Sequence, residues 1–211
     1  MIRVIVCDDH PIVREGVRMI ISQQKDISIE EEASNGQELL SKLAGRNIDV
    51  IILDISLPGG LDGIELLKTL QREHPRTPVL VMSMHPESLL GVRAIRAGAS
   101  GYVVKGSDAA ELLTAIRKLS HGGKYITSTL AEQLAGEVTT GRPRAAHEKL
   151  SDREYRVLCL LASGRGISDI AEELFLSPAT VGTYRARLLA KLGLRNTAEL
   201  VRYAVEHRLL D

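Results

Sequence analysis

The sequence predicts an α/β fold, a five-stranded doubly wound parallel sheet, followed by a small all-α four-helix domain. Strand-like runs alternate with helical patterns over the first 120 residues. Three of these runs (residues 4–7, 50–53 and 79–82) are apolar throughout, as expected for central parallel strands covered on both faces. From Leu150 onward every segment has a helical pattern. The alternation predicts a three-layer sandwich with right-handed crossovers.

The predicted elements of the first part are short and regularly spaced. The strands are expected at residues 2–7, 28–32, 49–53, 78–82 and 101–104. The helices are expected at residues 11–23, 35–45, 62–74, 86–97 and 108–120. Pro11 and Pro86 suit the first turn of a helix, and Asp108 followed by Glu111 resembles a capping box.

The pattern changes after Gly122 and Gly123. Glycine, proline and threonine then indicate a linker, with one amphipathic piece near residues 128–138. Four helices are expected beyond it, at residues 151–162, 167–173, 177–192 and 196–207. Ser151 with Glu154 forms a second capping-box pattern, and Ser177 before Pro178 suits a helix start. We expect a domain over residues 1–121, a linker over 122–147 and a second domain over 148–211.

Composition limits the partners and the compartment. The chain has 27 basic and 27 acidic side chains, so any contact with nucleic acid must come from a local patch. Cys7 and Cys159 lie in apolar runs of different segments, which favours buried, unpaired thiols and a reducing compartment. The charged N-terminus does not resemble a signal peptide, and no apolar run approaches the roughly 18 residues of a membrane span. We expect a soluble, cytoplasmic protein with no membrane partner.

Polar residues follow four of the expected strands. Asp8 and Asp9 follow the first, Asp54 the third, Ser83 the fourth and Lys105 the fifth. The carboxyl ends of parallel strands line one crevice, so these side chains should meet there. Three carboxylates repel each other unless a cation lies among them, and oxygen ligands of this kind suit Mg²⁺. The set predicts an aspartate that accepts a phosphoryl group, with the ammonium and the hydroxyl stabilising the phosphoryl oxygens.

The same positions, with Pro58 four residues after Asp54, resemble the receiver domains of bacterial two-component response regulators, which have a flavodoxin-like sheet. The resemblance covers the first 120 residues. It implies that Asp54 is the phosphoacceptor. It further implies that Asp9 and Asp54 ligate Mg²⁺ directly, together with the carbonyl of Ser56, and that Asp8 acts through water.

The resemblance also implies a switch. Ser83 would turn toward the phosphoryl group, and Tyr102 would follow it inward. Two departures from the family pattern lie nearby. The loop from Pro58 to Gly63 has one residue more than is usual, with an effect that the sequence leaves open, and Gly106 follows Lys105 where many receivers have proline. Neither departure removes a residue of the pocket.

The second domain has the arrangement of a helix–turn–helix, in which the second helix can enter the major groove of DNA. On a helical wheel, one face of that helix is apolar and the opposite face has small and polar residues. We predict that Thr183 and Arg187 read bases and that Thr180, Arg185 and Lys191 contact phosphates. From periodicity alone, a small helical dimerisation or docking domain is an equal alternative.

The run LSDREYRVLCLLASG from Leu150, followed by SDIAEEL from Ser168 and SPATV from Ser177, resembles the LuxR-type effector domain. A receiver joined to such a domain is typical of the NarL/FixJ class of response regulators. Many members have a basic residue where this chain has Gly182. The segment TYRARL from Thr183 is similar to a subgroup of virulence and fimbrial regulators.

Together the two resemblances imply a phosphorylation-controlled transcription factor, not an enzyme. The implied partners are a sensor histidine kinase, double-stranded DNA and a second copy of the chain once phosphorylated; RNA polymerase is a further candidate. The last helix offers a candidate dimer surface, with ordinary packing as an equal alternative, through these residues: Leu200, Val201, Ala204 and Val205. Two rival functions are an aspartate-nucleophile phosphatase, which the lack of a cap insertion disfavours, and a DNA-binding regulator that acts without phosphorylation. Stimulus, operator, direction of regulation and the dimerising receiver face stay open.

Overall fold

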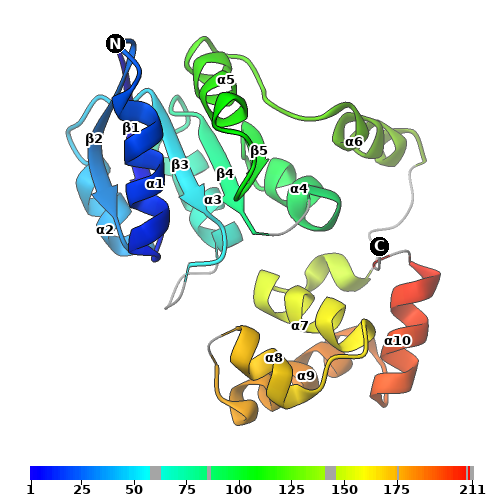
Figure 1. Ribbon diagram of the computed structural model, residues 1–211. Coiled ribbons are helices and arrows are strands. Elements are labelled where there is room, and N and C mark those ends of the chain that lie inside the picture. The colour runs from blue at the N-terminus through cyan, green and yellow to red at the C-terminus, as the bar shows by residue number, and fades with distance from the viewer. Residues whose placement is uncertain (58–62, 85–86, 141–145, 175, 208, 210–211) are drawn as a thin grey trace. The chain divides into compact units, whose positions relative to one another are not determined.

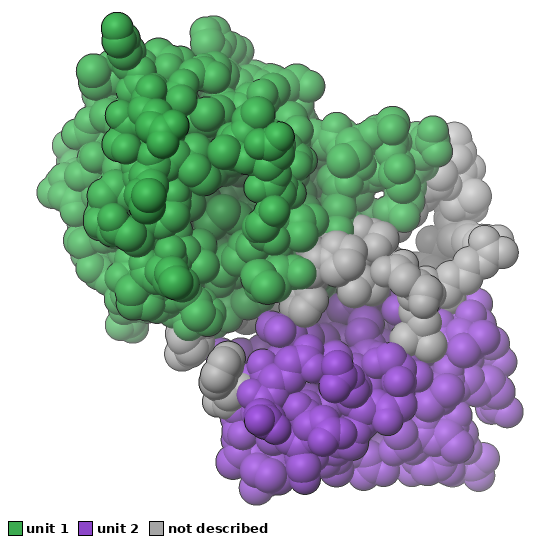
Figure 2. Space-filling model, viewed as in Figure 1, with its two compact units in different colours: residues 1–141 green, residues 142–211 purple. Residues whose placement is uncertain are grey.

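The computed structural model describes residues 1–57, 63–84, 87–140, 146–174, 176–207 and 209. The chain divides into two compact units, residues 1–141 and residues 142–211 (Figure 2). None of the helices in the described part of the chain has the length and apolar character that a membrane crossing requires.

Unit 1 contains the predicted five-stranded parallel sheet, in the order β2-β1-β3-β4-β5 (Figure 1). Its strands are β1 (Ile2–Cys7), β2 (Ile27–Ala33), β3 (Val50–Asp54), β4 (Val79–Ser83) and β5 (Gly101–Val104). The strand order reverses between β1 and β3, because the chain winds outward to one side through β2 and to the other through β4 and β5. Such a reversal opens a crevice at the carboxyl ends of the two central strands.

Five helices cover the two faces of this sheet. They are α1 (Pro11–Ser22), α2 (Gly36–Leu43), α3 (Gly63–Glu73), α4 (Glu87–Arg96) and α5 (Ala109–Ser120). Helices α1 and α5 share one face and a common core with the strands, whereas α2, α3 and α4 lie on the other (Figure 1). Pro11 occupies the first helical turn as predicted, and Asp108 caps α5 by accepting a hydrogen bond from the amide of Ala110. The predicted role of Pro86 lies outside the described residues.

The segment after α5 packs on unit 1. Tyr125 pairs with the edge of β5: its amide donates to the carbonyl of Ser100 (2.9 Å), and its own carbonyl accepts from the amide of Tyr102 (3.1 Å). Helix α6 (Ser128–Thr140) follows and contacts α4, with Leu130 fully buried. The hydroxyl of Thr127 donates to the carboxylate of Glu87 at the start of α4. Residues 122–140 of the predicted linker therefore lie within unit 1.

Unit 2 contains the four predicted helices, preceded by a short 3₁₀ helix, η1 (Ala146–Lys149). The helices are α7 (Asp152–Ala162), α8 (Ile167–Glu173), α9 (Pro178–Leu192) and α10 (Thr197–Glu206). The capping box of Ser151 and Glu154 is confirmed, and Ser177 caps α9 through the amide of Thr180. Gly193 ends α9 in the left-handed region, at φ 68°.

The prediction of a dimer surface on α10 is wrong for two of its four residues. Leu200 and Ala204 are buried against the rest of unit 2, where α10 packs on α7. Val201 is partly buried, and Val205 alone of the four is largely exposed, at 61%. The apolar face of α10 is therefore used mainly for the core of the unit.

Candidate functional site

The carboxyl ends of β1, β3 and β5 bring together three charged side chains that are far apart in the sequence. Asp54 is the last residue of β3, and Asp8 directly follows β1; both carboxylates are buried, at 1% and 0% exposure. Lys105 follows β5 and reaches across to them. Its Nζ lies 2.7 Å from Asp8 Oδ2 and 2.6 Å from Asp54 Oδ2. The structure thus assembles the charged centre that the strand ends predict.

Asp9 and a neighbour that sequence reasoning missed complete an acidic cluster. Ligand atoms of Asp8, Asp9, His10 and Asp54 all lie within 4.8 Å of one another. The Nδ1 atom of His10 lies 2.9 Å from Asp9 Oδ1 and 3.3 Å from Asp8 Oδ1. The position of His10 directly after the acid pair was the signal that could have indicated it. The half-exposed imidazole stands at the mouth of the cluster.

Burial and charge act against each other in this cluster. Burial raises the pKa of Asp54, the Asp8 carboxylate adds to this, and the Lys105 ammonium opposes it. Burial acts to lower the pKa of Lys105, but Asp54 and Asp8 outweigh it, so that the pKa of Lys105 is raised. Lys105 therefore stays charged. Burial, with the charges of Asp54 and Asp8, raises the pKa of Cys7 to about 12, so its thiol stays protonated and packs as a small apolar group.

Ser56 contacts this centre through its backbone, and the predicted switch residues Ser83 and Tyr102 lie on the neighbouring strands β4 and β5. The amide of Ser56 donates to Asp54 Oδ1 (2.8 Å), which fixes the carboxylate, whereas a metal-ligating role for the Ser56 carbonyl stays a prediction. Ser83 ends β4, is fully buried, and accepts a hydrogen bond from the Lys105 amide at its carbonyl (2.6 Å). Tyr102 is buried at 1% exposure, so its ring already occupies the inward position.

The cluster fits a magnesium ion by the chemistry of its donors. Carboxylate oxygens from Asp8, Asp9 and Asp54 converge, two of these residues are buried, and a single ammonium neutralises only part of their charge. Mg²⁺ prefers a few carboxylate ligands with water and phosphoryl oxygens in the remaining positions. The partly exposed Asp9 leaves one side of the cluster open to solvent.

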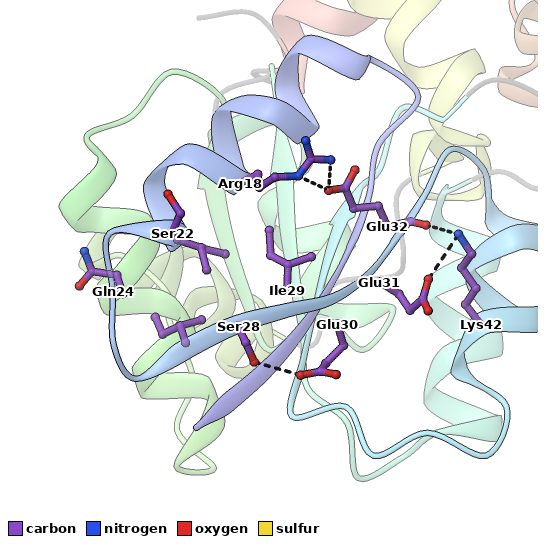
Figure 3. A pocket seen from close by; sticks show the side chains of 11 residues that line it. Arg18, Ser22, Gln24, Ser28, Ile29, Glu30, Glu31, Glu32 and Lys42 are labelled. Carbon is purple, nitrogen blue, oxygen red and sulfur yellow. Dashed lines mark hydrogen bonds and ion pairs between the residues drawn. The ribbon is translucent and has the colours of Figure 1, made fainter.

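A separate hollow lies elsewhere in unit 1, between α1 and the edge strand β2 (Figure 3). It has a volume of about 620 Å³, and Arg18, Glu32 and Lys42 are among its lining residues. Its walls contain none of the predicted site residues. Two ion pairs lie among its lining side chains, Arg18 with Glu32 and Lys42 with Glu31. The hollow is therefore separate from the site formed by Asp8, Asp9 and Asp54.

The five predicted DNA contacts all lie on α9, but their side chains differ in freedom. Thr183 and Arg187 are exposed, and no hydrogen bond or ion pair engages Arg187 within the described residues. Arg185 Nε donates to the Thr197 hydroxyl (3.0 Å), and Lys191 Nζ donates to Glu154 Oε2 (2.6 Å). The hydroxyl of Thr180 lies 2.8 Å from that of Ser177. Arg187 is thus the least constrained of the cations.

Comparison with protein families accounts for both units. Residues 4–117 match the family described as response regulator receiver domain, and residues 148–204 match bacterial regulatory proteins of the luxR family. The chain belongs to the NarL/FixJ class of response regulators. The receiver match spans the strand ends that carry the acidic cluster, and the luxR match spans the helix–turn–helix of α8 and α9.

Several curated proteins resemble this response regulator over its whole length. It is 33% identical to the response regulator UvrY of Escherichia coli K12, over 100% of this chain and 97% of that protein. It is 34% identical to the response regulator GacA of Pseudomonas viridiflava, over 100% and 99%. It is 32% identical to the oxygen regulatory protein NreC of Staphylococcus carnosus, over 99% of each chain.

Solved structures show the same two-part architecture. RcsB from Salmonella enterica serovar Typhimurium, bound to promoter rprA in the presence of phosphomimetic BeF3−, matches with a TM-score of 0.61 and 27% identity, over 96% of this chain and 97% of RcsB. A second RcsB–DNA complex matches with a TM-score of 0.59 and 28% identity, over 97% and 98%. This response regulator is accordingly a phosphorylation-dependent DNA-binding regulator of transcription.

Proposed function

We propose that Asp54 accepts a phosphoryl group from a sensor histidine kinase and that this modification controls promoter binding by α9. One observation carries the proposal: the buried carboxylates of Asp54 and Asp8 share the ammonium of Lys105 beside Asp9. A buried nucleophile held next to a cation and a set of metal-binding carboxylates is what phosphoryl transfer to aspartate requires.

In the transfer step, one oxygen of Asp54 forms a bond to phosphorus while the phosphorus–nitrogen bond to the donor histidine breaks. The histidine nitrogen keeps the electron pair. Asp8, Asp9, Asp54 and the carbonyl of Ser56 would hold Mg²⁺, which neutralises the phosphoryl oxygens when bound. Lys105 is already within ion-pair distance of Asp54 and would follow the phosphoryl group with a small movement of its Nζ. The Ser83 hydroxyl would donate to another phosphoryl oxygen.

Phosphorylation of Asp54 would change the conformation of the receiver through Ser83 and Tyr102. The phosphoryl group would favour the state in which Ser83 turns toward it and Tyr102 stays buried, shifting an existing equilibrium. In that state we expect homodimers whose two α9 helices bind paired half-sites about one helical turn apart. We place the protein in the cytoplasm as a regulator, not an enzyme, with RNA polymerase as a candidate partner at the promoter.

The test is DNA affinity in the two states. A duplex would be selected from a random pool with the full chain in beryllofluoride and Mg²⁺, and the dissociation constant then measured at one fixed salt concentration. We expect beryllofluoride to tighten binding by about tenfold or more in the wild type and to leave Asp54→Asn unchanged. Equal affinities in both states would show that DNA binding is independent of the receiver site. A selection that enriches no sequence would contradict the DNA-binding half of the proposal.

A further inference from the structure

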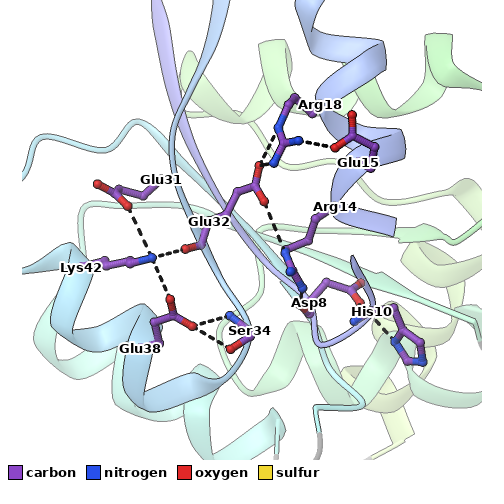
Figure 4. Close-up of polar contacts among 10 residues, drawn as sticks. All are labelled: Asp8, His10, Arg14, Glu15, Arg18, Glu31, Glu32, Ser34, Glu38 and Lys42. Carbon is purple, nitrogen blue, oxygen red and sulfur yellow. Dashed lines mark hydrogen bonds and ion pairs between the residues drawn. The ribbon is translucent and has the colours of Figure 1, made fainter. Parts of the chain in front are cut away.

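We propose that Arg14, on α1, is a positioning residue for the metal-binding carboxylates: its guanidinium fixes the peptide between Asp8 and Asp9. The Nη1 atom of Arg14 donates to the carbonyl oxygen of Asp8 at 2.7 Å. On its other side, Nε of Arg14 donates to Glu32 Oε2 at 3.3 Å (Figure 4). The inference rests on the proposed function, since it concerns the same site.

Glu32 is itself held firmly, so Arg14 is anchored to the sheet. Glu32 lies on β2 in register with Val6 of β1. Lys42 Nζ donates to the Glu32 carbonyl (2.5 Å), so the backbone of Glu32 is fixed by the strand and by this bond. The side chains of Arg14 and Glu32 are mostly buried. A partly buried guanidinium that donates two hydrogen bonds has little conformational freedom, because its planar fork fixes the direction of each bond.

The orientation of this one peptide decides where Asp9 points. The carbonyl of Asp8 belongs to the peptide bond that leads into Asp9, and the amide of Asp8 is already bonded to the Ala33 carbonyl (3.1 Å). On the far side, the His10 amide donates to Asp8 Oδ1 (2.9 Å). Between these two fixed points, the bond from Arg14 sets the rotation of the peptide. Without it the Asp9 carboxylate would sample orientations that do not face Asp54.

Such a role predicts weaker metal binding when Arg14 is lost, although Arg14 touches no metal ligand atom in the described residues. Groups that orient metal ligands typically contribute 10- to 100-fold in affinity. Arg18 supplies a matched control, because it bonds to the same Glu32 on the same helix but makes no hydrogen bond to Asp8 in the described residues. A general loss of ion pairing at Glu32 would affect both arginine variants alike.

The experiment measures Mn²⁺ binding to the full chain by electron paramagnetic resonance, since carboxylates bind Mn²⁺ and Mg²⁺ alike. Arg14→Gln should weaken binding by about tenfold or more, and Arg18→Gln should leave it within about twofold of wild type. Arg14→Lys, which retains one donor group, should lie between. Thermal unfolding of each variant checks that the fold is kept. Wild-type affinity in Arg14→Gln, or equal weakening in Arg18→Gln, would overturn the inference.

A second measurement separates a role of Arg14 in positioning the metal ligands from a role in phosphoryl transfer itself. With acetyl phosphate as donor, Arg14→Gln should raise the Mg²⁺ concentration at half-maximal phosphorylation while the rate at saturating Mg²⁺ stays near wild type. A lower saturated rate with an unchanged Mg²⁺ dependence would contradict the positioning role. If the wild type binds no Mn²⁺ and takes up no phosphoryl group, the proposed function fails and the inference with it. If the wild type does both and Arg14→Gln matches it, the inference alone fails.

Discussion

At the scale of single residues, Lys105 neutralises part of the charge of the acidic cluster. Its ammonium lies within ion-pair distance of both Asp8 and Asp54. Lys105→Met should lower the free energy of unfolding by about 3 kcal/mol without divalent cations, because two buried carboxylates lose their partner. Added Mg²⁺ should restore part of this loss. Urea unfolding with and without Mg²⁺ measures both effects.

The control for that change is Lys68→Met. Lys68 pairs with Glu65 on the exposed side of α3, so removing it should cost less than about 1 kcal/mol, with no dependence on Mg²⁺. Equal losses for the two lysine variants would show that Lys105 does not stabilise the buried carboxylates of Asp8 and Asp54.

Replacing either of two cations of α9 should have a different effect: loss of Arg187 should weaken DNA binding, and loss of Lys191 should lower stability. Arg187→Ala should weaken binding to the selected duplex by roughly 1–3 kcal/mol and relax specificity at one position, without loss of stability. Lys191→Gln should instead lower stability, because Lys191 is paired with the buried Glu154 at the start of α7. Burial acts to raise the pKa of Glu154, but Lys191 and the Ser151 amide outweigh it and leave that pKa lowered. Equal weakening on all duplexes for Arg187→Ala would refute its role as a base reader.

Single residues also mark where sequence reasoning succeeds and where it stops. Asp54 and Lys105 could be found because the end of a strand fixes where the backbone points. The roles of His10 and Arg14 depend on where long side chains reach after folding, which no strand pattern encodes. For the same reason, the pairing of Lys191 with Glu154 could not be predicted, because it depends on the packing of α7 on α9.

At the scale of elements, the edge of β5 needs a glycine. A Cβ atom at Gly101 would lie 2.9 Å from the backbone oxygen of Tyr125 and 3.0 Å from Leu80 Cδ1. Gly101→Ala should therefore push the segment before α6 away from β5 and cost about 1–3 kcal/mol of stability. Hydrogen exchange should show faster exchange at the Tyr125 and Tyr102 amides, which form the bridge.

Gly182→Ala is the matched control on a helix. Nothing lies within 4 Å of a Cβ atom at Gly182, so the change should stabilise α9 by about 0.5–1 kcal/mol through backbone entropy alone. A Gly101→Ala protein that is as stable as wild type and keeps slow exchange at Tyr125 would show that the contact is not tight.

Elements were predictable to within one or two residues because each has a local signal: an apolar run, a capping residue or a glycine. The packing of α6 on α4 had no such signal, since it depends on the Leu130 side chain packing against Gly91, which has no Cβ atom. Gly63 is similar, because a Cβ atom there would lie 2.0 Å from the Ile55 carbonyl oxygen. The loop with the extra residue, 58–62, lies outside the described residues, and its effect stays open.

At the scale of the whole molecule, two units of different chemistry share one chain. The net charge of zero gives the chain as a whole no electrostatic attraction to DNA, so under the proposed function the local positive charge on α9 has to supply it. We propose that a modification in the receiver then controls DNA binding by changing dimerisation. The likeness of α9 to virulence and fimbrial regulators stays a prediction.

The central claim is that Asp54 accepts a phosphoryl group, and intact mass spectrometry after incubation with acetyl phosphate and Mg²⁺ tests it most directly. We predict one phosphoryl adduct on the wild type and on Asp26→Asn, which changes an exposed aspartate that pairs with Arg117. We predict none on Asp54→Asn and none on the wild type with chelator in place of Mg²⁺. An adduct on Asp54→Asn, or no adduct on the wild type together with no response to beryllofluoride, would contradict the account.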